Sequence, residues 1–160
     1  MADPVIETFG KEFDRFHDLL LQQVDLCPSE EAWLEKTGRF AYWWHFMHVF
    51  AIIEWYTLPL GAPARQTWFP DDVVRAKAEP SRAMTRDEVR ALAAAMKTLG
   101  HEYLATQSRE TLMDKNEGMS KTLGREVTNL DALMGMVRHY SYHVGCVDSL
   151  LRAKGIPGVL

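Results

Sequence analysis

The sequence predicts an all-α protein: one domain over residues 1–160, built as a four-helix bundle with a long connection between its second and third helices. Two observations predict this fold. Four long stretches have the apolar spacing or the composition of helices, and no stretch of useful length alternates apolar and polar residues as a half-buried strand does. Helices with apolar faces bury them against one another, which favours a bundle.

The first and third predicted helices have clear starts. The first begins at about Pro4, because proline suits the first turn of a helix, and ends near Leu26 before a Cys-Pro-Ser sequence. Its apolar residues recur at spacings of three and four: Phe9, Phe13, Phe16, Leu20 and Val24. The third opens with a capping box of Thr85 and Glu88 and continues to about Thr106.

The second predicted helix starts at residue 31 or 38 and runs through residue 58, where Pro59 and Gly61 end it. Its stretch FAYWWHFMHVFAIIEWYTLPL is long and apolar enough to raise the alternative of a membrane span. Two histidines and Glu54 lie inside that stretch, and aromatic residues fill its centre rather than its ends. We therefore expect a buried helix of a soluble bundle and no membrane partner.

This second helix also leads to an expectation about assembly. It carries apolar residues on every side, more than one bundle interior needs, so we expect part of its surface to meet a second copy of the chain in a homodimer. The following residues, 59–82, are rich in proline and alanine and are expected to form a long connection over the bundle.

The last predicted helix follows a polar segment, 107–127, that fits a short helix or an ordered loop. Thr128 or Asn129 caps it, and it ends in the sequence AKGIPG, a glycine stop followed by proline. Apolar residues alternate spacings of three and four along it: Leu130, Leu133, Val137, Tyr140, Val144, Val147 and Leu151. At about 100° per residue, His139 and His143 fall beside this stripe, on the apolar side of the helix.

Composition excludes several classes of function. Eighteen basic and twenty-two acidic residues give a formal charge of −4, and no basic run stands out that would attract nucleic acid. Cys27 and Cys146 form neither a disulfide framework nor a CxxC zinc motif. The first fifteen residues carry acids and lack an apolar core, so no signal peptide is visible and a cytoplasmic location is the default.

The histidines carry the chemical signal. In HYSYH, His139 and His143 are four residues apart and can aim two ring nitrogens at one point, as a metal site requires. His45 and His48, three apart in the second helix, also share a face. The alternative is that all of these imidazoles are satisfied in the core without a metal.

Three other side chains receive plainer interpretations. His17 lies between charged residues and His101 lies beside Glu102, so we expect both to be surface or boundary residues. Cys146 could act as a soft ligand, but a small buried thiol is the more common outcome.

The segments WHFMHVFAIIEWY at 44–56 and MVRHYSYHVGCVDSLLRAKG at 136–155 resemble the DinB/YfiT-like family of metal-dependent enzymes, which are four-helix bundles. The resemblance implies that His48, His139 and His143 bind a metal, with Glu54 matching the acid that follows the first histidine. It departs from the family at Cys146, where a glutamine is common. His45 has no general counterpart and could be a hydrogen-bonding partner of a ligand, a fourth ligand or unrelated.

The expected function follows from three neutral imidazoles. They leave positions open on a divalent ion, as in catalytic sites, and suit zinc, nickel or iron, with zinc or nickel favoured. The ion would activate a thiol or water for attack on a small electrophilic substrate, as in a transferase or hydrolase, with a low-molecular-weight thiol as a candidate cosubstrate. The alternatives are a non-catalytic bundle that binds a metal or another ligand, and a purely structural protein.

No catalytic residue is assigned from the sequence. Glu54 is the nearest acid along the chain, but it lies about 240° around the helix from His48 at about 100° per residue. We therefore expect Glu54 to be a structural or partner-facing residue rather than a general base.

Overall fold

The computed structural model describes residues 3–160 and is mostly helical, which confirms the all-α class. The elements in chain order are α1 (Pro4–Leu26), α2 (Glu30–Leu34), β1 (Lys36–Thr37), β2 (Phe40–Ala41), α3 (Tyr42–Ala51), α4 (Ile53–Thr57), α5 (Asp71–Val74), α6 (Arg86–Ala105), α7 (Glu117–Leu123) and α8 (Asn129–Ala153).

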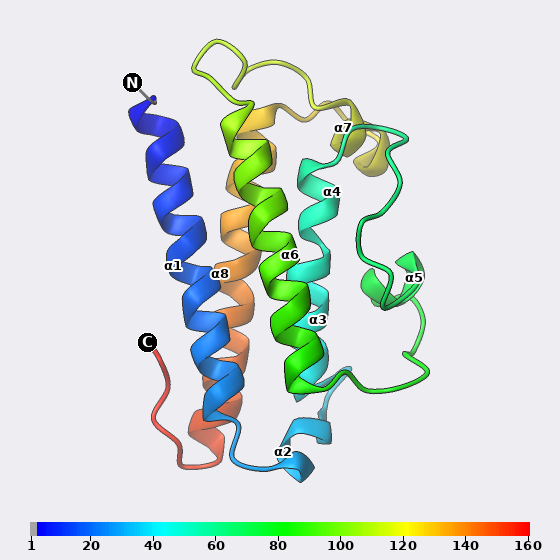
Figure 1. Cartoon of the computed structure of the whole chain (residues 1–160), viewed down its shortest axis with the longest axis vertical. Helices are drawn as coiled ribbons and strands as arrows, with labels where there is room; N and C mark the ends of the chain where they lie inside the picture. Colours follow the sequence, from blue (N-terminus) through cyan, green and yellow to red (C-terminus); the bar gives the residue numbers. More distant parts are fainter. Residues whose placement is uncertain (1–2) are drawn as a thin grey trace.

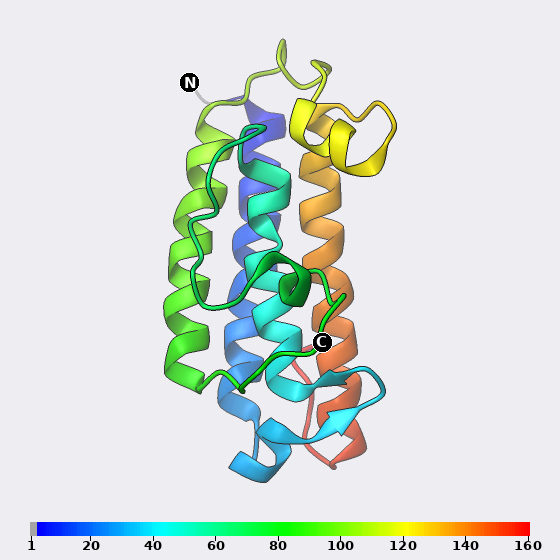
Figure 2. The same ribbon diagram turned by 90° about the vertical axis from the view of Figure 1, so that its right-hand side faces the viewer.

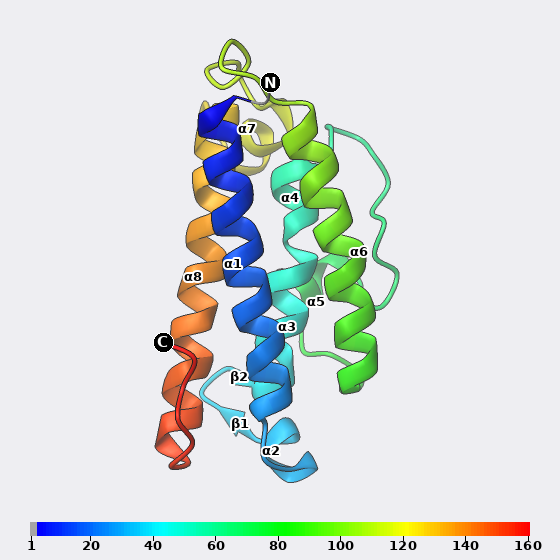
Figure 3. The same ribbon diagram turned by 60° about the vertical axis from the view of Figure 1, so that its left-hand side comes forward.

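Four long rods run alongside one another: α1, the pair α3 and α4, α6, and α8 (Figure 1). Helix α1 contacts α8 and α6, while α3 contacts α6 and α8. The shorter elements lie around these rods, with the hairpin β1–β2 beside the first residues of α3 (Figure 3). Helices α3 and α8, which carry the two histidine pairs, are therefore direct neighbours.

The first, third and last predicted helices begin where the sequence places them. Asp3 caps α1 by accepting a hydrogen bond from the backbone N–H of Val5. Thr85 and Glu88 form the expected capping box at the start of α6. Thr128 caps α8, since its hydroxyl oxygen accepts from the backbone N–H of the third helical residue. Local capping chemistry thus defines the starts of all three helices.

The prediction of the second helix is wrong in part. The chain from residue 30 to residue 41 forms α2 and the antiparallel hairpin β1–β2 instead of one continuous helix, and Gly38 turns the hairpin with a φ of +64°. The helical part then breaks into α3 and α4 at Ile52, which keeps right-handed helical angles. The two short helices therefore follow nearly one axis (Figure 1).

The long connection covers the outer side of α3 and α4 (Figure 2). It contributes Phe69, Val73 and Val74 to the core, and the ring of Phe69 stacks on Trp43 with centroids 5.9 Å apart. The apolar residues on the outer side of α3 are therefore buried by this chain itself. The observation that led us to expect a homodimer is explained without a second copy, and the dimer stays a prediction.

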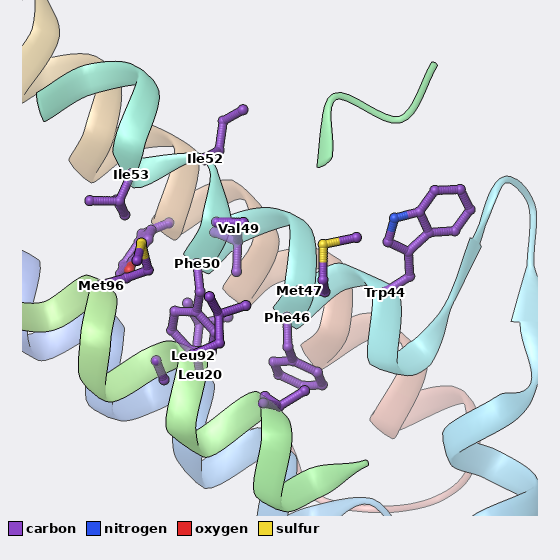
Figure 4. Close-up of a cluster of buried hydrophobic side chains, with 14 of the residues drawn as sticks. Leu20, Trp44, Phe46, Met47, Val49, Phe50, Ile52, Ile53, Leu92 and Met96 are labelled. Atoms are coloured by element: carbon purple, nitrogen blue, oxygen red, sulfur yellow. The ribbon is translucent and has the colours of Figure 1, made fainter. Parts of the chain in front are cut away.

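The core lies between the rods. Figure 4 shows Phe46 and Phe50 of α3 reaching toward Leu92 of α6 and Leu20 of α1, all of them fully buried. Within residues 3–160, no helix combines the length and the apolar character that a membrane crossing requires.

Candidate metal centre

His48 of α3 and His139 and His143 of α8 form a cluster of ring nitrogens. One nitrogen from each lies within 4.8 Å of the others, so the three could hold a metal ion. The shortest approach is 3.1 Å, between Nε2 of His48 and Nε2 of His139. Zinc–nitrogen bonds of about 2.0–2.1 Å in a tetrahedron place ligand nitrogens about 3.4 Å apart. The spacing of these side chains therefore suits a small divalent ion.

The remaining ring nitrogen of His48 is held by the backbone. Its Nδ1 lies 2.5 Å from the carbonyl oxygen of Val74 in α5. Because a carbonyl only accepts, Nδ1 carries the proton and donates it, which leaves Nε2 with a free lone pair. Such a partner for the second nitrogen is the usual arrangement of a metal-binding histidine.

His143 has a histidine as its partner. Its Nδ1 lies 3.2 Å from Nδ1 of His45, a buried side chain 8% exposed. One of these nitrogens donates to the other, so the pair shares one proton across this contact. His45 lies outside the group of three convergent nitrogens. Its position suits a hydrogen-bonding partner of His143.

All four imidazoles are kept neutral. Burial lowers the pKa of His45 and of His139 to about 4, and it lowers the pKa of His48 and of His143 as well. The neighbouring histidines lower the pKa of His139 and His143 further, because two adjacent positive imidazoliums repel. Only neutral imidazole binds a metal, so at pH 7 the side chains are in the binding form.

Two aromatic rings contact the cluster. Phe40, from β2, has its ring centroid 5.0 Å from that of His45 and 5.7 Å from that of His48. The exposed Tyr142 of α8 meets the ring of His143 edge to face, with the ring centroids 5.2 Å apart. These rings restrict the rotation of the imidazoles and so help to fix where their nitrogens point.

Glu54 is not part of the cluster and instead holds the long connection. Its buried Oε1 accepts hydrogen bonds from the backbone N–H groups of Arg65 and Gln66, both at 2.6 Å. The side chain of Gln66 then donates to the carbonyl of Phe69 at 2.7 Å. This anchors the connection that leads to Val74. The expectation that Glu54 is structural agrees with these contacts.

The prediction for His17 is wrong. Its side chain is 1% exposed and packs against the aromatic rings of Phe50 and Tyr140, with Nδ1 3.5 Å from the Tyr140 hydroxyl. The charged residues beside it in the sequence suggested a surface, but Arg15 and Asp18 are exposed while the imidazole of His17 turns into the core. His101 is exposed and its Nε2 lies 2.8 Å from Asp14, as a surface position allows.

Sequence reasoning missed two contributors to the site. The Val74 carbonyl belongs to the backbone, and no residue type signals such a role. Phe40 reaches the histidines because the hairpin turns the chain back just before α3, and Gly38 was the one available signal for that turn. Cys146 is partly buried and lies outside the group of three histidines.

No protein-family model matches the chain, and no curated protein matches it.

Proposed function

We propose that the protein is a metal-dependent enzyme of the DinB/YfiT-like type, a four-helix bundle in which His48, His139 and His143 hold one divalent ion. The observation that carries the proposal is the 3.1 Å approach of two Nε2 atoms from neighbouring helices. Two lone pairs at that distance repel unless a proton or a cation lies between them. A third imidazole at the same point favours a cation.

Several features support the family assignment. The order of the helices and the places of the histidine pairs on α3 and α8 agree with the resemblance of the two sequence segments. Cys146 stands where the family often has glutamine, so the function of that amide is not carried over. The four-helix bundle of DinB-like type is supported by the four rods that lie side by side (Figure 1).

The residues of the chain would prepare the ligands. The Val74 carbonyl keeps the proton of His48 on Nδ1, and Nδ1 of His143 would donate its proton to Nδ1 of His45, so that Nε2 of each ligand would carry the lone pair that binds the ion. When bound, a divalent ion with an open position supplies a thiolate or hydroxide at neutral pH for attack on a small electrophile. Three nitrogen ligands suit zinc or nickel, and iron remains a candidate.

One observation favours a second candidate, a non-catalytic bundle that binds a metal or another ligand. Glu54, the acid nearest to the histidines along the chain, already accepts two backbone hydrogen bonds. Its carboxylate is therefore engaged in structure and is a poor general base. An enzyme at this site would need the ion or the substrate to supply that function.

The experiment uses protein without a histidine tag, loaded with zinc or nickel and screened against pairs of small thiols and electrophiles. We expect thiol-dependent turnover that chelation abolishes, with a rate that rises with pH as the nucleophile ionises. Absence of turnover, together with protein side chains that fill every coordination position, would favour the non-catalytic bundle. Absence of metal in the purified and reconstituted protein would overturn the enzyme and the metal-binding form of the bundle, and would leave only a bundle that binds another ligand.

A further inference from the structure

The three histidines of the cluster are not held in the same way. The second ring nitrogen of His48 contacts the carbonyl oxygen of Val74, and that of His143 contacts His45. Nε2 of His139 faces Nε2 of His48, but its Nδ1 makes no hydrogen bond to an atom of residues 3–160. Within the protein, this imidazole is therefore oriented by the groups that pack against its ring. Besides the rings of His48 and His143, which belong to the cluster themselves, one further aromatic ring of the described chain lies near it.

That further ring is the side chain of Tyr56 in α4. Its centroid lies 6.3 Å from that of His139, and the two ring planes are tilted by 59°. This is a favourable distance and tilt for a pair of aromatic rings. The partly buried Tyr56 also packs against a small apolar cluster of Met119, Val127 and Ala132. Because these contacts come from α7, from the segment before α8 and from α8 itself, they restrict the movement of the ring.

Gly135 makes the close approach of Tyr56 possible. It lies one helical turn before His139 on α8, so the two residues share a face of that helix. A Cβ atom at Gly135 would lie 2.8 Å from Cε1 of Tyr56, whereas carbon atoms pack best about 3.5–4.0 Å apart. Glycine is less favourable than alanine inside a helix. The ring of Tyr56, which occupies the space of a side chain, explains why glycine is buried at this position.

We propose that Tyr56 is a positioning residue of the metal centre: its ring, seated on Gly135, fixes the orientation of the His139 imidazole and so the direction of Nε2. This inference rests on the proposed function, because it requires the metal at His48, His139 and His143. It adds two residues on which metal affinity depends although neither of them binds the ion.

Two glycine variants test the proposal. Gly135→Ala and Gly145→Ala add the same methyl group to the interior of α8, but a Cβ atom at Gly145 would meet open space in the described chain. Zinc affinity is measured on tag-free protein by competition with a metal indicator. We expect Gly135→Ala to weaken zinc binding about tenfold or more, as the loss of a ligand's supporting contact does. Gly145→Ala should leave the affinity unchanged. Equal affinities of the two variants would overturn the proposal.

Tyrosine variants separate the ring from its hydroxyl group. Tyr56→Phe keeps the ring and should retain the zinc affinity of the wild type, whereas Tyr56→Ala should weaken it about tenfold. When Tyr56→Ala is combined with Gly135→Ala, the new methyl group no longer meets the ring, so the two losses should not add. Weaker binding in Tyr56→Phe, or additive losses in the double variant, would contradict a role of the ring. If Gly135→Ala does not fold, the two tyrosine variants decide the test.

Cobalt(II) provides a measurement that a general loss of stability would not change. Its visible absorption depends on the arrangement of its ligands. At saturating cobalt, the spectrum should shift in Gly135→Ala and Tyr56→Ala and should match the wild type in Gly145→Ala and Tyr56→Phe. Identical spectra in all four saturated variants would assign any loss of affinity to stability alone and overturn the proposal. Failure of the wild-type protein to bind zinc or cobalt contradicts the proposed function instead.

Discussion

Two groups of histidines differ in what their ring nitrogens face: the cluster of α3 and α8 around His139, and His17 of α1, which packs against α8. His139 points to His48 and His143, with nitrogen atoms about a metal-ligand spacing apart. Its neighbour Tyr140 packs instead against His17 of α1, where the imidazole meets aromatic rings and one hydroxyl at 3.5 Å. Burial lowers the pKa of His17 to about 4, as it does for His139.

The difference shows what distinguishes a candidate metal site from a buried imidazole. Burial alone keeps both histidines neutral, so a lowered pKa does not separate them. The separation comes from convergence, because only the region around His139 directs ring nitrogens from two helices to one point. Each experiment below tests this difference between the cluster around His139 and the region around His17.

The largest expected effect is the stabilisation of the protein by metal. At a free metal concentration about 1,000 times the Kd, the free energy of unfolding should rise by about 4 kcal/mol, because the ion binds only the native state. His139→Ala should abolish this increase. His17→Ala should destabilise the protein through a cavity and still show the full increase. Denaturant unfolding with and without zinc measures both, and the opposite pattern would assign the site to His17.

The next effect is acid sensitivity. His17, His45 and His139 have folded pKa values of about 4, below the ordinary 6.5, so the unfolded state binds more protons between those values. The contribution of these three side chains to the free energy of unfolding is therefore complete above about pH 6.5 and is lost as the pH drops toward 4. With zinc the fall should be steeper, because protons also displace the ion. Unfolding curves at several pH values measure the slopes, and identical slopes with and without zinc would count against metal binding.

A smaller effect should follow from removal of the Glu54 carboxylate, which holds the long connection in place. Glu54→Ala leaves two backbone N–H groups without their acceptor, which should cost about 1–3 kcal/mol of stability. It should also weaken zinc binding about tenfold, because Val74 then no longer orients His48 firmly. Glu102→Ala is the matched control, since Glu102 pairs with the exposed side chain of Arg65 in the same connection. Equal zinc affinity in both variants would show that the hydrogen bonds of Glu54 do not influence the metal site.

The smallest expected effect concerns His45. His45→Ala should weaken zinc binding by about tenfold, as the loss of a ligand's hydrogen-bonding partner does. His48→Ala should weaken it far more, because it removes a ligand. Competition titrations with a metal indicator rank the two variants. The reverse ranking would mean that His45, and not His48, is the ligand from α3.

Much of the fold could be predicted because its signals are local. Pro4, Thr85 and Thr128 mark helix starts through capping chemistry that acts within one turn. The hairpin before α3 could not be predicted, since its strands, Lys36–Thr37 and Phe40–Ala41, are too short to show an alternation of apolar and polar residues. The hairpin is supported by tertiary contacts, of Phe40 with His143 of α8 and of Lys36 with Glu79 of the connection.

The candidate site likewise has parts that local sequence signals predict and parts that depend on the packing of the whole chain. Helical spacing placed His139 beside His143 and His45 near His48, but the approach of α3 to α8 depends on the packing of the whole chain. His17 was misjudged because neighbours in the sequence, Asp18 among them, lie on another face of the helix. The Val74 carbonyl could not be found at all, because every residue carries one.

Metal stoichiometry of the tag-free protein and its single variants tests the central claim most directly. Native mass spectrometry after reconstitution with zinc should show one ion per chain in the wild type and in His17→Ala. It should show strongly reduced occupancy in His48→Ala, His139→Ala and His143→Ala, each confirmed as folded by circular dichroism. One ion per chain in all three of those variants would contradict the account and place the metal elsewhere.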